Sequence, residues 1–151
     1  TAMFSFIRLV IAFLASAGLT VAAAAIADSQ LVLNALIEVG AQATMNDRIE
    51  MAAGNLGPFL GLYGAFIALG FLIAFLAAAL VSRILPLPRG LVFMAAGGGA
   101  IFVMLTLMRE AFFGVDLIAS ARTPLGLGVQ IGCGMFGGLV FTLLSAAPAR
   151  D

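Results

Sequence analysis

The sequence has no lysine, no histidine and no tryptophan, and it has one cysteine. Without histidine it offers no imidazole to a haem, a metal or a catalytic dyad, and one cysteine cannot close an internal disulfide. Charge is scarce as well, since seven Arg balance seven Asp and Glu for a formal net charge of zero. The lack of a basic excess excludes the phosphate-neutralising surface of a nucleic-acid-binding protein.

The sequence is instead rich in apolar residues. Of its 151 residues 64% are hydrophobic and 9% are charged, and the mean hydropathy is +1.22. A soluble globular domain has about a quarter of its residues charged, so this composition predicts an integral membrane protein. The expected fold class is all-α, with residues 1–151 forming a single membrane domain.

Four uncharged runs are long enough to cross a bilayer as helices. The first, residues 9–27, would extend about 28 Å at 1.5 Å per residue, close to the thickness of the hydrocarbon layer. Pro58 is expected in the first turn of the second span, and Thr123 followed by Pro124 predicts the N-cap and first residue of the fourth. The predicted spans are residues 9–27, 59–81, 91–108 and 125–147.

The distribution of arginine predicts the orientation of these spans. An even number of spans places both termini on one side, and that side has four Arg against three on the other. Since basic residues favour the cytoplasmic side, both termini are predicted to be cytoplasmic. The use of Arg without Lys, together with many Ala and Gly, suits a GC-rich bacterial genome, so the expected location is the bacterial inner membrane, with a multi-pass chain.

The long connection between the first two spans, residues 28–57, has a helical periodicity. Polar residues recur every four positions beside an apolar stripe, which indicates an amphipathic helix capped by Asp28 or Ser29. We expect this helix to lie at the outer membrane interface or to fold onto the bundle, with docking on a partner as the alternative. The polar positions are Gln30, Asn34, Glu38, Gln42 and Asn46.

Small residues are the expected packing contacts, because helices in lipid associate through close backbone approach and a few polar contacts. The pairs at 128/132 and 134/138 project from largely opposite sides of the fourth span, so either could contact a helix of this chain or of another chain. Gln130 is expected to hydrogen-bond to a neighbouring helix, with substrate contact as the alternative. The glycines concerned are Gly57, Gly61, Gly97, Gly98, Gly99, Gly128, Gly132, Gly134 and Gly138.

The predicted spans contain no Asp, Glu, Arg or His, the groups with which proton- or ion-coupled transporters usually work. Charged residues gather instead outside the membrane, where they either anchor helix ends or support chemistry on lipid headgroups. No cofactor is predicted, although apolar grooves could hold a lipid, a quinone or a carotenoid. The polar candidates on the outer face are Glu38, Asp47, Arg48, Glu50, Arg109, Glu110, Asp116 and Arg122.

Residues 46–54, an Asn/Arg/Glu loop, lead into the glycine-rich residues 61–64, and this stretch resembles small bacterial four-helix membrane proteins of unknown function. The chain is also similar to the microsomal glutathione transferase superfamily, which has four spans and an Arg-x-x-Arg-Ala-x-x-Asn-x-x-Glu motif. Arg48, Ala52 and Asn55 match that motif, whereas Met51 replaces its second Arg and Pro58 its Glu. These departures remove glutathione-binding charges, so the resemblance does not extend to the activity.

The leading hypothesis is a non-catalytic membrane subunit that packs against a larger membrane-protein assembly, such as a respiratory or photosynthetic complex. Its partners would be other membrane-protein subunits and lipids, and no nucleic acid. One alternative is a small homo-oligomeric transporter or channel, in which Gln130 and the stripe with Glu38 line a path. A further alternative is a membrane lipid-modifying enzyme that uses the outer-face carboxylates.

Overall fold

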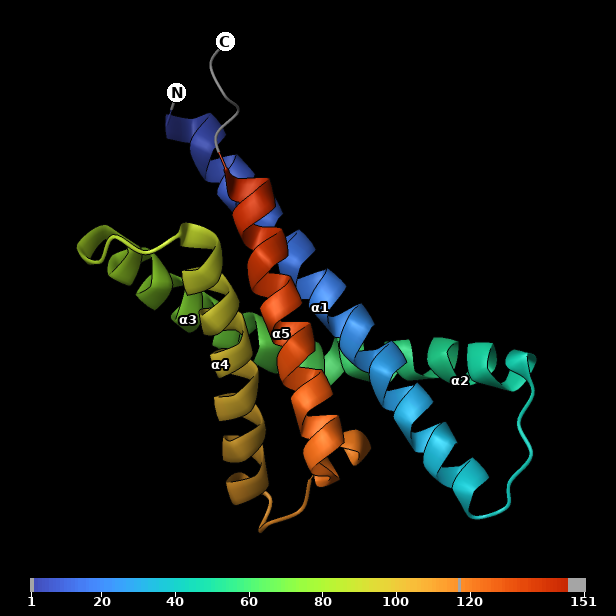
Figure 1. Ribbon diagram of the computed structural model, residues 1–151. Helices are drawn as coiled ribbons and strands as arrows, with labels where there is room; N and C mark the ends of the chain where they lie inside the picture. Colours follow the sequence, from blue (N-terminus) through green and yellow to red (C-terminus); the bar gives the residue numbers. More distant parts are fainter. Residues whose placement is uncertain (1, 117, 147–151) are drawn as a thin grey trace.

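The structure, a computed structural model, describes residues 2–116 and 118–146, and within these ranges it is helical and has no strand (Figure 1). The elements, in chain order, are α1 (Ala2–Glu38), α2 (Met45–Pro58), the π-helical segment η1 (Phe59–Tyr63), α3 (Gly64–Ile84), α4 (Arg89–Ala111), the 3-10 helix η2 (Ala119–Arg122) and α5 (Pro124–Ser145).

Four helices are long and apolar enough to cross a membrane: Ala2–Glu38, the continuous run Met45–Ile84, Arg89–Ala111 and Pro124–Ser145. The prediction of an all-α chain with four such helices is confirmed to this extent. Thr123 caps α5 as expected, since its hydroxyl accepts the Gly126 N–H at 3.1 Å, and Pro124 is the first helical residue. The predicted end of the last span, Ala147, lies outside the described residues.

The segment between the first two spans differs from the prediction of one amphipathic helix that starts at Asp28 or Ser29. That boundary is wrong, because α1 continues through both residues to Glu38. Ser29 does not cap a new helix, because its hydroxyl donates to the Ile26 carbonyl of the same helix at 2.7 Å. The chain breaks further along, at Gly40, whose φ of +100° ends α1 in a conformation that suits glycine.

The expected helix start at Pro58 is also wrong, since α2, η1 and α3 form one continuous helical run. Pro58 has no N–H to donate to the preceding turn, and the helix widens into a π-helical segment directly after it. The run begins instead at a capping box, in which Thr44 and Asp47 each accept a hydrogen bond from the other's backbone N–H.

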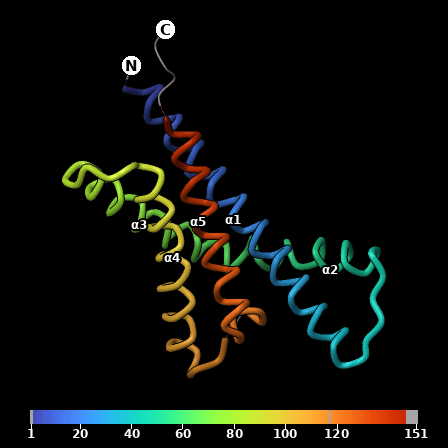
Figure 2. Tube along the Cα trace, viewed as in Figure 1, coloured from blue at the N-terminus to red at the C-terminus, as the bar shows by residue number. Residues whose placement is uncertain are grey.

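Helix α5 lies at the centre of the bundle, with its most extensive contacts to α4 and α1, while α3 packs mainly on α4 and crosses α1 obliquely (Figures 1 and 2). The start of α1 and the end of α5 lie side by side, since the Arg8 Nε donates to the Leu144 carbonyl at 3.1 Å. We call this the terminal end of the bundle. The opposite end contains the end of α1, the end of α4 and the start of α5.

Two kinds of contact hold the centre together. Where α4 crosses α5, the backbones touch through glycine: a methyl group on Gly97 would overlap Gly134, and one on Gly138 would overlap the Phe93 carbonyl. Beside this crossing, the rings of Phe75, Phe93 and Phe141 contact one another, with centroids 4.6–5.5 Å apart. Close backbone approach and aromatic contacts therefore hold the centre together, and both can act between helices in lipid as well as in water.

Candidate functional site

A buried polar network joins α1 to four other elements, and it begins at Asp28. The Asp28 side chain is 6% exposed, and its two oxygens have different partners. Oδ1 accepts the Ser120 backbone N–H at 2.9 Å, and Oδ2 accepts the Asn55 side-chain amide at 3.1 Å. Asn55 also donates to the Ala25 carbonyl at 3.1 Å. Through these hydrogen bonds, Asp28 links α1 to α2 and to η2.

The network continues to Gln130, which is fully buried in α5. Its Nε2 donates to the Ser120 hydroxyl and to the Ala24 carbonyl, both at 3.2 Å, and its Oε1 accepts the Tyr63 hydroxyl at 3.2 Å. One amide therefore links α5 to α1, η1 and η2. This arrangement matches the expectation that Gln130 bonds to neighbouring helices.

Every buried side-chain polar atom in the described parts of the chain has a hydrogen-bond partner. The side-chain polar atoms of Asp28 and Gln130 thus all have hydrogen-bond partners within the chain. The network does correct one expectation: a carboxylate is buried in the bundle, one residue beyond the predicted end of the first span. Sequence analysis missed it because charge was interpreted as a span boundary, whereas Asp28 gains its partners from residues 27 and 92 positions away.

Arg48 forms a second junction between α1 and α2. Its two terminal nitrogens donate to the side-chain oxygens of Gln30 and Asn34, at 2.8 Å and 2.9 Å. The polar stripe predicted for residues 30–46 thus faces α2 in its first part, and its later members, Gln42 and Asn46, lie outside α1. Arg48 and Asn55, which carry the resemblance to the microsomal glutathione transferases, both join these two helices.

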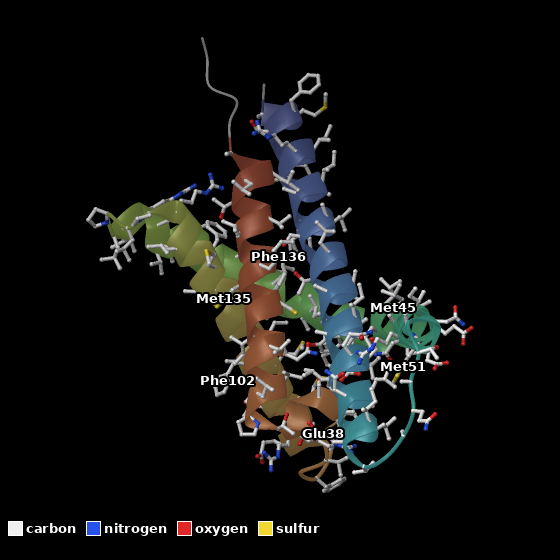
Figure 3. All side chains as sticks on the ribbon, turned by 45° about the vertical axis from the view of Figure 1, so that its right-hand side comes forward. Glu38, Met45, Met51, Phe102, Met135 and Phe136 are labelled. Carbon is white, nitrogen blue, oxygen red and sulfur yellow. The ribbon has the colours of Figure 1, made fainter. Side chains whose placement is uncertain are left out.

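The outer-face polar candidates do not converge on one centre. Glu38 ends α1 and is exposed (Figure 3), Arg109 and Glu110 end α4, and Asp116 and Arg122 lie in the connection to α5, where the Arg122 guanidinium donates to the Asp116 carbonyl. In the described residues no three Asp, Glu, Cys or His side chains are grouped so that they could hold a metal.

On α2 the carboxylates of Asp47 and Glu50 form hydrogen bonds near the start of the helix. Glu50 accepts a hydrogen bond from Asn46, one turn earlier, at 3.0 Å. Asp47 accepts the backbone N–H and the hydroxyl of Thr44, and these bonds lower the pKa of Asp47 from its usual 3.8. Both are exposed local contacts that stabilise the start of the helix.

The predicted packing glycines fall into two groups. Some lie in tight helix contacts inside the chain, namely Gly97, Gly98, Gly134 and Gly138, and sequence analysis missed Gly137, which faces Thr20 and Phe71. The others face open space, with no atom within 4 Å of a Cβ built on them; these are Gly57, Gly61, Gly99, Gly128 and Gly132. The face of α5 with Gly134 and Gly138 thus contacts α4 of this chain. The face with Gly128 and Gly132 has no neighbouring helix within the described chain.

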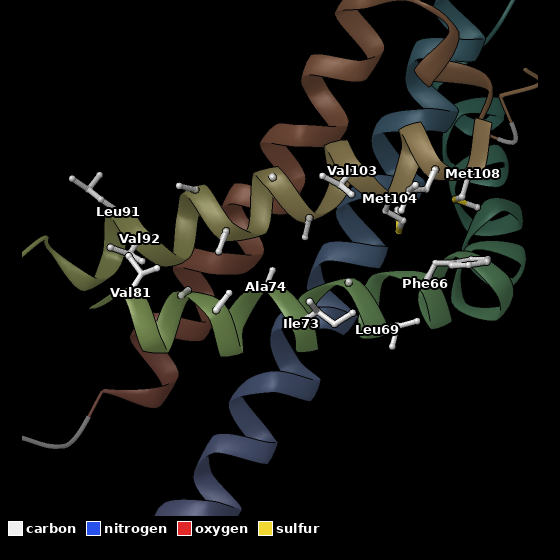
Figure 4. A pocket seen from close by; sticks show the side chains of 18 of the residues that line it. Phe66, Leu69, Ile73, Ala74, Val81, Leu91, Val92, Val103, Met104 and Met108 are labelled. Carbon is white, nitrogen blue, oxygen red and sulfur yellow. The ribbon is translucent and has the colours of Figure 1, made fainter. Parts of the chain in front are cut away.

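A wide groove runs between α3 and α4 (Figure 4). Its volume is about 1020 Å³, and all 21 residues that line it are apolar. Nine of these are Gly or Ala, including Gly70 and Ala74 on α3 and Ala95 and Gly99 on α4. Larger side chains lie toward its two ends, with Phe66 and Met108 at one end and Val81 and Leu91 at the other (Figure 4).

A second groove, of about 640 Å³, lies among α1, α3, α4 and α5 at the terminal end. Apolar side chains form most of its wall, with Leu9, Val10 and Phe13 on α1 and Leu72 and Leu76 on α3. Its remaining wall is polar, because Ser82, Arg83 and Arg89 also line it. Unlike the α3/α4 groove, it therefore combines an apolar surface with positive charge.

No protein-family model matches this chain, and no curated protein or solved structure matches it significantly.

Proposed function

We propose that this chain is a non-catalytic subunit of the bacterial inner membrane, and that its α3/α4 groove receives an apolar transmembrane helix from a different subunit of a larger membrane-protein assembly. The observation that carries the proposal is the groove itself, with its volume of about 1020 Å³ and its wholly apolar lining. Four helices long and apolar enough to cross a bilayer support the membrane location.

The floor of the groove favours a helix as its occupant. Ala95 and Gly99 lie four residues apart on α4, and both are exposed, so a neighbouring backbone could approach α4 as closely as α5 does on its other side. Small residues at this spacing let helices pack in lipid, where close van der Waals contact replaces the hydrophobic effect. The larger side chains toward the two ends of the groove would limit sliding of the bound helix.

The arginine count of the full sequence, four against three, favours an orientation with both ends in the cytoplasm. Of the described arginines, Arg8, Arg83 and Arg89 lie at the terminal end, and the other three lie on α2, at the end of α4 and in the α4–α5 connection. Basic residues near span ends favour the cytoplasmic side.

The polar residues favour a structural role over the two alternatives. A channel that uses Gln130 needs that amide to face a water-filled path, but Gln130 is fully buried and bonded to three residues of its own chain. A lipid-modifying enzyme needs carboxylates near one another, and the exposed acids are spread over α1, α2 and the end of α4.

The test compares two glycine-to-leucine variants of the tagged chain, purified from native membranes in mild detergent and analysed by mass spectrometry. Gly99→Leu fills the floor of the groove, and Gly132→Leu makes the same change on α5, outside it. Both glycines are exposed, and neither has an atom within 4 Å of a built Cβ, so the two positions are matched in the space around the backbone.

The wild type and Gly132→Leu are expected to co-purify with one membrane protein in fixed stoichiometry, and Gly99→Leu is expected to lose it. A wild-type chain that purifies alone or only with copies of itself would refute the subunit proposal. Loss of the partner in Gly132→Leu, with retention in Gly99→Leu, would show that the partner binds outside the groove.

A further inference from the structure

We propose that the second groove, at the terminal end, binds one anionic phospholipid, with the phosphate at Arg83 and Arg89 and an acyl chain along the apolar wall formed by α1 and α3. This site is separate from the α3/α4 groove, and it needs only that the chain lies in a bilayer. The juxtaposition that carries the inference is an apolar groove of about 640 Å³ with two guanidinium groups in its lining.

The apolar part of the groove extends along α3. Its lining on this helix runs from Leu72 to Arg83, which are 11 residue steps apart, about 16 Å along the helix axis. Leu9 and Phe13 of α1 form the facing wall, one helical turn apart. The groove therefore extends from the two arginines along α3 between apolar side chains, which is what an acyl chain attached to a charged headgroup requires.

The charged part of the groove is held in place by its neighbours. The Arg89 guanidinium lies 5.3 Å from the centroid of the Phe93 ring, and its Nη2 donates to the Ser145 hydroxyl at 3.0 Å. A guanidinium has five N–H donors, so this side chain keeps others for a phosphate. Arg83 lies in the last turn of α3, and it lines the same groove.

Positive charge at this end is not balanced by carboxylates of the described chain. Arg8, Arg83 and Arg89 all lie here, and the described acids lie on the later part of α1, on α2, at the end of α4 and beyond it. Basic pockets between transmembrane helices on the cytoplasmic side are suited to anionic headgroups. A phosphate diester would bring negative charge to Arg83 and Arg89, and its attached chains would lie along the apolar wall.

The competing explanation is that these arginines are ordinary interface anchors. An interface anchor interacts with many headgroups of the membrane surface and selects none of them. A site in a groove binds one lipid through both its headgroup and its acyl chain. The two explanations therefore differ in stoichiometry, in the effect of blocking the apolar wall, and in competition by a headgroup without chains.

The experiment is native mass spectrometry of the full chain in nonionic detergent, titrated with phosphatidylglycerol or with phosphatidylcholine that has the same acyl chains. We expect one phosphatidylglycerol to bind at least tenfold more tightly than phosphatidylcholine. Arg83→Gln should weaken phosphatidylglycerol binding about fivefold, and Arg83→Gln with Arg89→Gln about 25-fold, because each basic residue near an anionic lipid contributes a factor of about five.

Two matched variants separate the site from general charge and from the free anion. Arg109→Gln removes the same charge at the opposite end and should leave the lipid preference unchanged. Leu72→Trp narrows the apolar wall and should weaken phosphatidylglycerol even with both arginines present. Glycerol phosphate, the headgroup chemistry without chains, should compete at least 100-fold more weakly than the lipid.

Equal binding of the two lipids would overturn the proposal, and so would a loss of preference in Arg109→Gln as large as that in Arg83→Gln. Glycerol phosphate that competes as strongly as the lipid would identify a site for a free anion. Unchanged phosphatidylglycerol binding in Leu72→Trp would show that the apolar wall does not contribute to binding. That result would also refute a lipid site in the groove. These results are independent of whether a partner helix occupies the α3/α4 groove.

Discussion

Replacing Gln130 by Leu tests whether the buried polar network stabilises the bundle. Gln130 makes hydrogen bonds of 3.2 Å to Tyr63, Ala24 and Ser120. Leucine removes all of these bonds and leaves the Tyr63 hydroxyl, on a residue 3% exposed, without its partner. Hydrogen bonds between helices in a bilayer average about 0.6 kcal/mol each, so we expect the free energy of unfolding to fall by about 2 kcal/mol.

The fluorescence of Tyr63 can be used to measure this change in stability. Tyr63 is the only tyrosine and there is no tryptophan, so intrinsic fluorescence on titration with sodium dodecyl sulfate in mixed micelles reports directly on the network. Combining Gln130→Leu with Tyr63→Phe in a double-mutant cycle isolates the bond between the two side chains. Because Tyr63→Phe removes the only tyrosine, all four proteins of the cycle are followed by circular dichroism in the same titration. We expect a coupling energy of about 0.6 kcal/mol, and at most about 1.7 kcal/mol.

A change in stability below about 0.3 kcal/mol, with no coupling to Tyr63, would refute the argument that Gln130 links the helices. If liposomes that contain the wild type conducted a solute and those with Gln130→Leu did not, while stability stayed unchanged, the amide would belong to a transport path.

Three further perturbations test individual contacts. Gly138→Leu would overlap the Phe93 carbonyl, so it should destabilise the bundle by about 3 kcal/mol or more in the same titration, and an unchanged midpoint would contradict the α4–α5 contact. Thr123→Ala removes the N-cap of α5 and should cost about 1 kcal/mol, whereas Thr123→Ser should restore most of that loss. The folded state lowers the pKa of Asp47 from 3.8, so its stabilisation of α2 is present above that pH and is lost as the pH falls through the lower folded-state pKa. Circular dichroism below pH 3.8 should show less helix as the pH falls, and Asp47→Asn should remove that step; an identical step in both proteins would exclude Asp47 as its source.

Much of the helix inventory could be predicted from composition and spacing. The apolar runs are continuous in the sequence, and Thr123 with Pro124 marks a helix start through contacts within one turn, so local rules suffice. Arg8 and Leu144 also fit the expectation that the two ends of the chain lie together. At the start of α5, therefore, the contacts that decide the boundary lie within one turn, and the sequence is sufficient to predict it.

The interruptions and the polar network could not be predicted in this way. Asp28 looks like a span end until Asn55 and Ser120 are brought against it by the fold. Pro58 looks like a helix start because proline favours the first turn, yet the π-helical segment after it accommodates the missing N–H within a longer helix. Glycine pairs likewise do not reveal from their spacing which of them the chain itself covers.

The central claim, that another protein's helix occupies the α3/α4 groove, is tested most directly by crosslinking in native membranes. A photoreactive side chain at Ala95, on the floor of the groove, is compared with one at Gly132 on the exposed side of α5. We predict that Ala95 forms an adduct with one distinct membrane protein, at a site within an apolar span, and that Gly132 does not. Adducts with lipid alone at Ala95, or with a second copy of this chain, would contradict the account.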